Sequence, residues 1–459
     1  MEFVKSKSFA ACGIVFIVVT WVHYWGIPGA QLGEAQSVTA GILLIASILW
    51  ITEWVPLFVV SFLILALQII WLYPLLTHSD FIQSEAIFFA PFFSDIILLF
   101  LGGFVLSILM QKYGLDLRFA HWILLKTNGA PALTLLGIIL ACSFLSMWIS
   151  NTATTAMMLT VVLPLLKDIP QAHPFRKALV LAIPFGCNLG GIGTPIGTPP
   201  NAIALSYLNK TDIAMTFGKW MLLTLPFLLI FLLLLWQTLL KLFPAGTLQL
   251  KVPKPTTEAF TNKHWAALVI FIATALGWFL SGYIGFSPGT VALLPIIFSF
   301  WFGLLKTSDF RSLPWDVLYI VAGGLALGVA LKASGLGELI VNAIPLNHSP
   351  IVLLVVFSAV ALVLSTVMSN TATAGLVIPL VINLKMADDQ LLSLVIALAL
   401  VCSMAMALPV STPPNAIAFS SRAISSRDML LTGSLLSLIG LVLLSMLGPV
   451  YWQFILSRV

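Results

Sequence analysis

Two short polar motifs each occur twice in a chain that is otherwise apolar. The residues SNTAT stand at Ser150–Thr154 and again at Ser369–Thr373, and the residues TPPNAIA follow Gly197 in one place and Ser411 in another. Hydroxyl and amide side chains both donate and accept hydrogen bonds, so they suit an anion or a hard cation. Because each motif lies inside a long apolar stretch, the pattern indicates a site for a small polar solute or an ion.

Backbone groups add to these side chains if each motif marks a break between two half-helices. A helix that ends leaves carbonyl groups unpaired, and a helix that begins leaves N–H groups unpaired. Carbonyl oxygens suit a cation such as sodium, whereas N–H groups at the positive end of a helix dipole suit an anion. The proline pairs Pro199–Pro200 and Pro413–Pro414 are expected to interrupt a helix. Neighbouring glycines such as Gly191 and Gly197 allow close backbone approach.

Composition places these motifs in a membrane protein. The chain of 459 residues is 60% hydrophobic and 8% charged, whereas soluble domains carry roughly 25% charged residues. Apolar runs of about 20 residues recur along the chain, which is the length of a helix that crosses a bilayer. A transmembrane barrel would instead show alternating polarity in segments of about 10 residues. The sequence therefore predicts an all-α polytopic membrane protein, and the net charge of +5 gives no reason to expect a nucleic-acid partner.

Eleven apolar segments are expected to be transmembrane helices, and two more to be re-entrant helical hairpins. The eleven lie near residues 8–25, 38–54, 57–76, 94–112, 178–208, 219–243, 264–282, 288–305, 314–331, 391–420 and 428–452. The stretches Pro131–Leu166 and Pro350–Leu384 are too long for one span, short for two, and polar in the middle. We expect each to be a hairpin with SNTAT near its tip, since irregular backbone at membrane depth is tolerated only inside protein or beside water.

The basic residues predict the orientation of this layout. With the N-terminus in the cytoplasm and the C-terminus outside, 16 of the 21 Lys and Arg residues fall on the cytoplasmic side and 5 fall outside. The two hairpins then open to opposite sides of the membrane. Landmarks of the first half recur in the second half at an offset of 221 residues, namely Asp95, Gly102, Gly103 and Gly114 as Asp316, Gly323, Gly324 and Gly335.

These landmarks predict an inverted repeat, an arrangement that places a transport site near the bilayer midplane. A first span and leader at 1–37 would lie outside the repeat. The first copy would be 38–243, with its broken helix at 178–208. A cytoplasmic linker at 244–263 would join it to the second copy at 264–459, with its broken helix at 391–420.

The polar residues could also have purely structural or enzymatic roles, which the pattern favours less. Ser and Thr often bond their own helix, and Gly and Pro often only permit packing, but four matched breaks favour a solute and ion site. Glu53 ends a span beside Pro56, which favours a helix-end role over that of a coupling acid. Asp95 and Asp316 begin spans, which favours N-terminal capping. An intramembrane hydrolase would need a nucleophile beside a base, and no such pair is evident. A channel is disfavoured by two closed polar sites between broken helices.

The chain resembles the divalent anion/sodium symporter family, whose members carry paired Ser-Asn-Thr motifs at hairpin tips and paired Thr-Pro-Pro breaks. The resemblance covers essentially the whole chain, including the segments ITEWVP, LGGFVL…YGL and VAGGLAL…SGL. It implies a homodimer in which each subunit has a scaffold part and a transport part. The transport part would carry the substrate across the membrane in the manner of an elevator.

The resemblance also implies the residues that bind substrate and sodium. The substrate carboxylates are expected to contact Ser150, Asn151, Thr152, Thr198, Ser369, Asn370, Thr371, Thr412 and Pro413. One sodium ion is expected at Ser146, Ser150, Asn151 and the backbone of Gly197. A pseudo-symmetric sodium ion is expected at Ser365, Asn370 and the backbone near Met368 and Ser411. The repeat is imperfect here, because Gly197 corresponds to Ser411 and Ile149 to Met368.

These residues predict sodium-driven uptake of a small dicarboxylate, with the C4 acids succinate, fumarate and malate as expected substrates. Because no Lys or Arg is expected inside the membrane, bound sodium ions would supply the charge that neutralises the anion. Each ligand would then raise the affinity for the other. A sodium-independent dicarboxylate exchanger of the same fold is the main alternative, and a symporter for sulfate or citrate is another. At least two sodium sites, no organic cofactor, no enzymatic activity and a place in the cell inner (plasma) membrane are expected.

Overall fold

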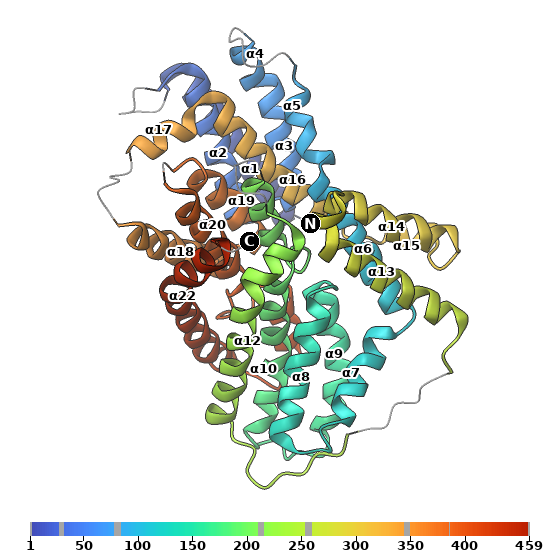
Figure 1. Cartoon of the computed structure of the whole chain (residues 1–459). Coiled ribbons are helices and arrows are strands. Elements are labelled where there is room, and N and C mark those ends of the chain that lie inside the picture. The colour runs from blue at the N-terminus through green and yellow to red at the C-terminus, as the bar shows by residue number, and fades with distance from the viewer. Residues whose placement is uncertain are drawn as a thin grey trace.

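The described residues fold into an all-helical, polytopic membrane protein. The computed structural model describes residues 2–26, 32–77, 84–209, 215–252, 259–343, 349–384 and 386–457, and this part of the chain contains helices but no β-strand (Figure 1). Ten of the described helices are long and apolar enough to cross a membrane. The all-α class predicted from composition is confirmed.

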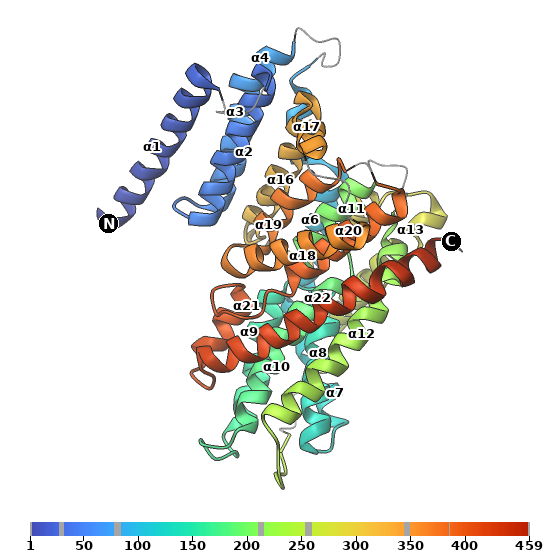
Figure 2. The same ribbon diagram turned by 90° about the vertical axis from the view of Figure 1, so that its left-hand side faces the viewer.

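The first half of the chain contains the helices up to α12. They are α1 (Glu2–Trp25), α2 (Glu34–Thr52), α3 (Leu57–Leu67), η1 (Gln68–Leu72), α4 (Tyr73–Leu76), α5 (Ala86–Phe89), η2 (Ala90–Phe93), α6 (Asp95–Lys112), α7 (Leu115–Leu125), α8 (Pro131–Ser146), α9 (Asn151–Leu166), α10 (Phe175–Gly190), η3 (Gly191–Gly193), α11 (Pro199–Leu208) and α12 (Phe217–Leu242). Figure 2 shows α1 at one edge of the molecule, beside α2.

The second half contains the remaining helices. They are α13 (Asn262–Ile284), α14 (Pro288–Trp301), α15 (Thr307–Arg311), α16 (Trp315–Ser334), α17 (Leu336–Ala343), α18 (Pro350–Val367), α19 (Asn370–Val381), α20 (Asp388–Ser403), α21 (Pro413–Ser420) and α22 (Ser426–Leu456). The helices α8 to α10 and α12 form the lower part of the view in Figure 1, while α18, α20 and α22 lie to their left.

The ten long helices differ from the eleven expected spans in three places. Nine expected spans are among the ten. The expected span at 288–305 is the shorter helix α14, and the expected broken span at 391–420 consists of α20 and α21, each also shorter than a full span. The tenth long helix is α18, which is the first arm of the second expected hairpin.

Both expected hairpins are present as pairs of helices joined at the SNTAT motif. The first pair, α8 and α9, has the bounds predicted from the sequence, and the second pair, α18 and α19, ends at Val381. In each pair the motif's serine is the N-cap of the second helix. The serine side chain accepts a hydrogen bond from the backbone N–H three residues later. This bond explains locally why the chain stops and restarts its helix there.

The glycines that recur at an offset of 221 residues make corresponding contacts in the two halves. A Cβ atom added to Gly102 of α6 would lie 2.6 Å from the Cβ of Ala292 on α14. A Cβ atom added to Gly323 of α16 would lie 2.5 Å from the Cβ of Ser61 on α3. Each glycine therefore permits the close approach of a helix from the other half of the chain.

A second recurring glycine pair ends these same helices. Gly114 follows α6 with a φ of +58°, and Gly335 follows α16 with a φ of +70°. This left-handed conformation favours glycine and turns the chain into a short helix, α7 after Gly114 and α17 after Gly335. The sequence pattern identified the two glycines but did not predict the short helices.

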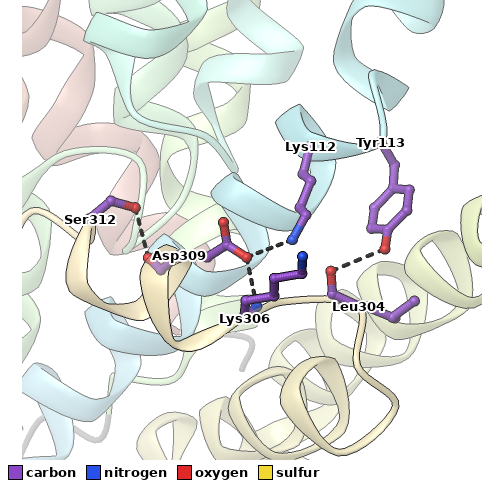
Figure 3. A network of polar contacts seen from close by, with 6 residues as sticks. All are labelled: Lys112, Tyr113, Leu304, Lys306, Asp309 and Ser312. Carbon is purple, nitrogen blue, oxygen red and sulfur yellow. Dashed lines mark hydrogen bonds and ion pairs between the residues drawn. The ribbon is translucent and has the colours of Figure 1, made fainter.

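An ion pair fixes the end of α6 to the connection between α14 and α16. The Nζ atom of Lys112 lies 2.6 Å from Oδ2 of Asp309 on α15, and the backbone N–H of Lys306 donates to the same carboxylate oxygen (Figure 3). Beside them, the hydroxyl of Tyr113 donates to the carbonyl of Leu304. The hydrogen bond from Lys112 is the main reason that the pKa of Asp309 lies below the usual range of an aspartate.

Candidate functional site

The repeated motifs open onto one cavity of about 1030 Å³. Twelve of the predicted site residues line it, namely Ser150, Asn151, Thr152, Gly197, Thr198, Met368, Ser369, Asn370, Thr371, Ser411, Thr412 and Pro413. The two others, Ser146 and Ser365, are fully buried behind the hairpin tips. The fold thus brings together residues from the two halves of the chain that are far apart in the sequence.

The first hairpin tip is held by hydrogen bonds among its own residues. The hydroxyl of Ser150 accepts from the backbone N–H of Ala153 at 3.2 Å. The hydroxyl of Ser146, at the end of α8, donates to Oδ1 of Asn151. The Asn151 side chain is thereby fixed at the cavity wall.

The second hairpin tip repeats these contacts and adds one. The hydroxyl of Ser369 accepts from the backbone N–H of Ala372 at 3.2 Å. The Oγ atom of Ser365 lies 2.7 Å from Oδ1 of Asn370 and also 2.7 Å from the carbonyl oxygen of Cys402 on α20. Ser365 therefore connects the tip of the second hairpin to the second broken helix.

The first broken helix consists of α10 and α11, and the asparagine of its TPPN motif holds the connection between them by hydrogen bonds. Nδ2 of Asn201 donates to the carbonyl oxygens of Gly191 at 2.9 Å and Thr194 at 2.8 Å. The hydroxyl of Thr194 donates to the carbonyl of Met147 in the neighbouring hairpin tip. A Cβ atom on Gly197 would lie 2.4 Å from the carbonyl oxygen of Gly191, so the close backbone approach expected of this glycine is present.

In the second broken helix, which consists of α20 and α21, the corresponding asparagine holds the connection in the same way. Nδ2 of Asn415 donates to the carbonyl oxygens of Leu408 at 3.0 Å and Met406 at 3.4 Å. The hydroxyl of Ser411 donates to the carbonyl of Thr366 at 2.9 Å. Each broken helix is thus connected by a hydroxyl to the hairpin of its own half.

The prolines of the TPPN motifs begin a helix and do not interrupt one. Pro199 and Pro200 occupy the first two positions of α11, and Pro413 and Pro414 occupy those of α21. A first turn does not need their missing N–H groups, and their fixed φ suits it. The expectation that they interrupt a continuous helix was wrong, because the preceding residues are already outside the helix.

A link between the two broken helices was not predicted from the sequence. Nδ2 of Asn188, on α10, donates to Oδ1 of Asn415 at 3.2 Å and to the hydroxyl of Thr412 at 3.4 Å. The hydroxyl of Ser403, on α20, reaches Thr198 at 3.4 Å. Asn188 is buried and lines the cavity. A lone amide in the apolar run LAIPFGCNLGG was the signal that could have identified it.

Of the three acidic residues singled out in the sequence, Glu53 and Asp316 line the cavity and Asp95 does not. Glu53 follows α2 in a left-handed conformation with a φ of +49° and is exposed, which agrees with the helix-end role expected for it. Asp316 lies in the first turn of α16. Asp95 does not cap its own helix, since its carboxylate accepts from Ser287 and from the N–H of Gly289 at the start of α14. Among the described residues that line the cavity, none is Lys or Arg.

Four helices begin at the cavity wall. The N-cap residues Ser150, Thr198, Ser369 and Thr412 all line it, at the starts of α9, α11, α19 and α21. The positive ends of four helix dipoles therefore converge on one space. The helix N-termini can bind an anion although the described lining contains two carboxylates, Glu53 and Asp316, and no Lys or Arg.

Comparison with known proteins gives the family. A family model described as a citrate transporter, CitMHS, matches residues 47–402. The chain belongs to this transporter family. Membership confirms the resemblance to divalent anion/sodium symporters, and it gives this chain the fold of a multi-pass membrane transporter. The family and the named relatives are transporters and not enzymes.

Several curated proteins are about equally similar to this chain in sequence. The Staphylococcus saprophyticus protein named sodium-dependent dicarboxylate transporter SdcS is 31% identical over 436 residues, covering 86% of this chain and 82% of that protein. The Saccharomyces cerevisiae inorganic phosphate transporter PHO87 is 31% identical over 403 residues, covering 85% and 43%. An uncharacterized transporter of Schizosaccharomyces pombe is 32% identical over 455 residues, covering 95% and 52%. The chain spans about half the length of the two fungal relatives.

Two solved structures share the fold at low sequence identity. The YdaH transporter of Alcanivorax borkumensis has a TM-score of 0.55 at 14% identity, covering 80% of this chain and 86% of that one. MtrF of Neisseria gonorrhoeae has a TM-score of 0.54 at 12% identity, covering 98% and 94%. At this identity the likeness concerns the fold alone.

Proposed function

We propose that this protein couples inward sodium movement to the uptake of C4 dicarboxylates such as succinate, fumarate and malate. The observation that carries the proposal is the convergence of four helix N-termini and two SNT tips on one cavity without Lys or Arg in its described lining. Four dipoles of about half a charge each suit a dianion. Carboxylate oxygens would accept hydrogen bonds from Ser150, Asn151, Thr152, Thr198, Ser369, Asn370, Thr371 and Thr412, with Pro413 shaping the wall.

Sodium ions would occupy the two pseudo-symmetric breaks. A Cβ atom on Gly191 would lie 3.1 Å from the side-chain amide of Asn151 and 3.1 Å from the carbonyl oxygen of Gly197, so two oxygen ligands converge there. With the hydroxyls of Ser146 and Ser150 they form a neutral oxygen set that suits a hard cation. The second set would comprise Ser365, Asn370 and backbone oxygens of Met368 and Ser411. Two cations near one dianion lower the cost of burying each.

Two inverted copies and an elevator movement are part of this proposal. The matching contacts of Gly102 and Gly323, the left-handed Gly114 and Gly335, and the two asparagine-closed breaks support copies at 38–243 and 264–459. We assign 1–37 and 244–263 to the leader and linker outside them. The helices α8 to α12 and α18 to α22 would form the moving part of each subunit in a homodimer.

The cavity would face the cytoplasm in this structure. Glu53, Gln111 and Ser312 line it, and each stands at a helix end or connection that the charge pattern assigns to the cytoplasmic side. In this orientation the N-terminus would lie in the cytoplasm and the C-terminus outside. The plasma membrane is the proposed location. The state would be one that releases substrate inward.

Phosphate is a second candidate substrate, because the similar yeast relative is named an inorganic phosphate transporter. Phosphate also accepts hydrogen bonds at helix N-termini. The shared chemistry is that of a small multivalent anion, and citrate and sulfate belong to the same class.

Uptake into proteoliposomes separates these candidates. Purified protein is reconstituted with and without an inward sodium gradient, and with and without internal succinate, and labelled succinate is followed. Accumulation that requires sodium but not internal substrate is the expected result. Uptake that requires internal succinate and ignores sodium would instead establish an exchanger. Competition by phosphate, citrate or sulfate at lower concentration than succinate would reassign the substrate.

A further inference from the structure

A second cavity, of about 370 Å³, lies beside the first hairpin tip. Its walls come from the end of α6, from α7, from the end of α8 and the turn after it, and from α13 with the residue Phe260 before it. Among the described residues that line it, Arg118 is the one charged residue, and the others are aliphatic or aromatic. An apolar cavity offers water no hydrogen-bonding partners, so it suits a hydrocarbon chain.

The walls of this cavity continue onto the outer surface of the protein. Trp122, Phe144 and Ile272 line the cavity and are 58%, 42% and 46% exposed. In a membrane protein such apolar side chains face lipid, and tryptophan is enriched where the bilayer meets water. The cavity is therefore accessible sideways from the bilayer, where acyl chains are the abundant ligand.

Arg118 gives the cavity a charged end. Its guanidinium carbon lies 5.2 Å from the ring centroid of Phe260, at the border of the apolar walls. A guanidinium group binds a phosphate group through paired hydrogen bonds, and basic residues on the cytoplasmic side of transmembrane helices attract anionic headgroups. We propose that this cavity binds one acyl chain of an anionic phospholipid whose phosphate contacts Arg118.

The bound lipid would contact the substrate site through Trp148. This residue lines both cavities. Its indole ring meets the ring of Phe271 on α13 at 5.6 Å and that of Phe217 on α12 at 6.2 Å. The indole N–H is buried and has no acceptor among the described residues. Because Trp148 stands two positions before Ser150, a lipid in the cavity would support the packing of the hairpin tip.

Native mass spectrometry of the purified protein tests the binding, with phosphatidylglycerol and phosphatidylcholine of the same chains as probes. We expect phosphatidylglycerol to bind more tightly, and the Arg118→Gln variant to lose about fivefold in its affinity for phosphatidylglycerol. Leu268→Trp, which fills the cavity, should reduce binding of both lipids. Lys241→Gln, a change at an exposed basic residue at the end of α12, is the matched control and should bind like the wild type.

A second readout locates the lipid. Phosphatidylglycerol brominated on its acyl chains should quench tryptophan fluorescence in the wild type, and the quenched fraction should fall in Trp148→Phe. Equal affinity for the two lipids, or unchanged phosphatidylglycerol binding in both Arg118→Gln and Leu268→Trp, would overturn the proposal. If Leu268→Trp does not fold, Ile272→Trp blocks the same wall from its exposed side. The binding does not depend on which anion the protein carries, so it stands or fails apart from the proposed function.

Discussion

Asn188 on α10 donates a hydrogen bond to Oδ1 of Asn415 across 3.2 Å, which joins the two broken helices at the cavity wall. Asn415 in turn holds the carbonyls that precede α21. The corresponding oxygen of Asn201, in the first break, is buried without a partner among the described residues. The two breaks are therefore similar in construction but differ in how they are supported.

This link predicts that Asn188 positions the second break. Asn188→Ala should weaken succinate binding by roughly 10-fold, because an unpaired buried oxygen on Asn415 costs about 1–3 kcal/mol. Asn188→Asp should weaken it further, since a carboxylate repels the dianion. Isothermal titration measures both. The control is the neighbouring change Cys187→Ala, at a buried residue outside the cavity lining, which should leave the succinate affinity near that of the wild type. Equal succinate affinity in all three variants would contradict the positioning role of Asn188.

The hairpin asparagines are predicted to be required for transport. Asn151→Ala and Asn370→Ala should each abolish most succinate uptake while the protein remains folded, because each removes an amide at the cavity wall. Uptake into proteoliposomes and size-exclusion chromatography provide the two readouts. Asn209→Ala, at the end of α11 and outside the cavity lining, is the matched control. Near-normal uptake in both hairpin variants would mean that the tips only cap helices.

The buried serines behind the tips are predicted to affect sodium more than substrate. Ser146→Ala and Ser365→Ala should raise the sodium concentration needed for half-maximal succinate binding, with little loss at saturating sodium. Ser365→Ala should have the larger effect, because Ser365 also contacts the carbonyl of Cys402. Binding is measured across a sodium series with choline as the replacement cation.

Ser358→Ala is the control for these serine variants. Ser358 lies on α18, is fully buried and makes no hydrogen bond through its hydroxyl with described residues. Its removal should leave the sodium dependence unchanged.

If succinate binds the wild type equally well without sodium, the symporter proposal fails and the exchanger replaces it.

The ion pair between Lys112 and Asp309 is predicted to stabilise the fold by up to about 1 kcal/mol at neutral pH. Because the pKa of Asp309 is lowered in the folded state, this contribution is present above the usual aspartate range and is lost as the pH falls through the lowered pKa. Asp309→Asn should lower the melting temperature at pH 7, and the difference from wild type should shrink in acid below about pH 4. A double-mutant cycle with Lys112→Gln isolates the pair; a cycle energy of zero at pH 7 would show that it contributes nothing.

The orientation of the hairpins is predicted to be measurable by cysteine labelling. Lys385, whose surroundings are expected to lie outside, is not among the described residues, so Asp388→Cys at the exposed start of α20 takes its place. Ala172→Cys, in the exposed connection beside Arg176, reports the other side. The background carries Cys12→Ala, since Cys12 is the exposed cysteine and the three others are buried. An impermeant maleimide added outside intact cells should label the Asp388→Cys variant and leave the Ala172→Cys variant unlabelled; labelling of both variants would refute the opposed hairpins.

The sequence by itself was sufficient for the features that depend on local chemistry. Apolar runs predicted the helices, and SNTAT predicted the position of each hairpin tip, where the structure shows its serine capping α9 or α19 through residues beside it in the chain. Recurring glycines marked corresponding positions in the two halves, and the structure then showed that helices pack closely at Gly102 and Gly323. These signals are local because helix formation and its termination are governed by neighbours in the chain.

The tertiary structure decided what local signals do not contain. Asn188 and Trp148 looked like single polar or aromatic residues in apolar runs, and only the packing of distant helices places one against Asn415 and the other between two cavities. The short helix α7, which carries Asp116 and Arg118, is too brief and too charged to be recognised as a helix beside the membrane spans. Contacts between segments some 200 residues apart follow from how whole helices fit together, so their partners cannot be derived from sequence spacing.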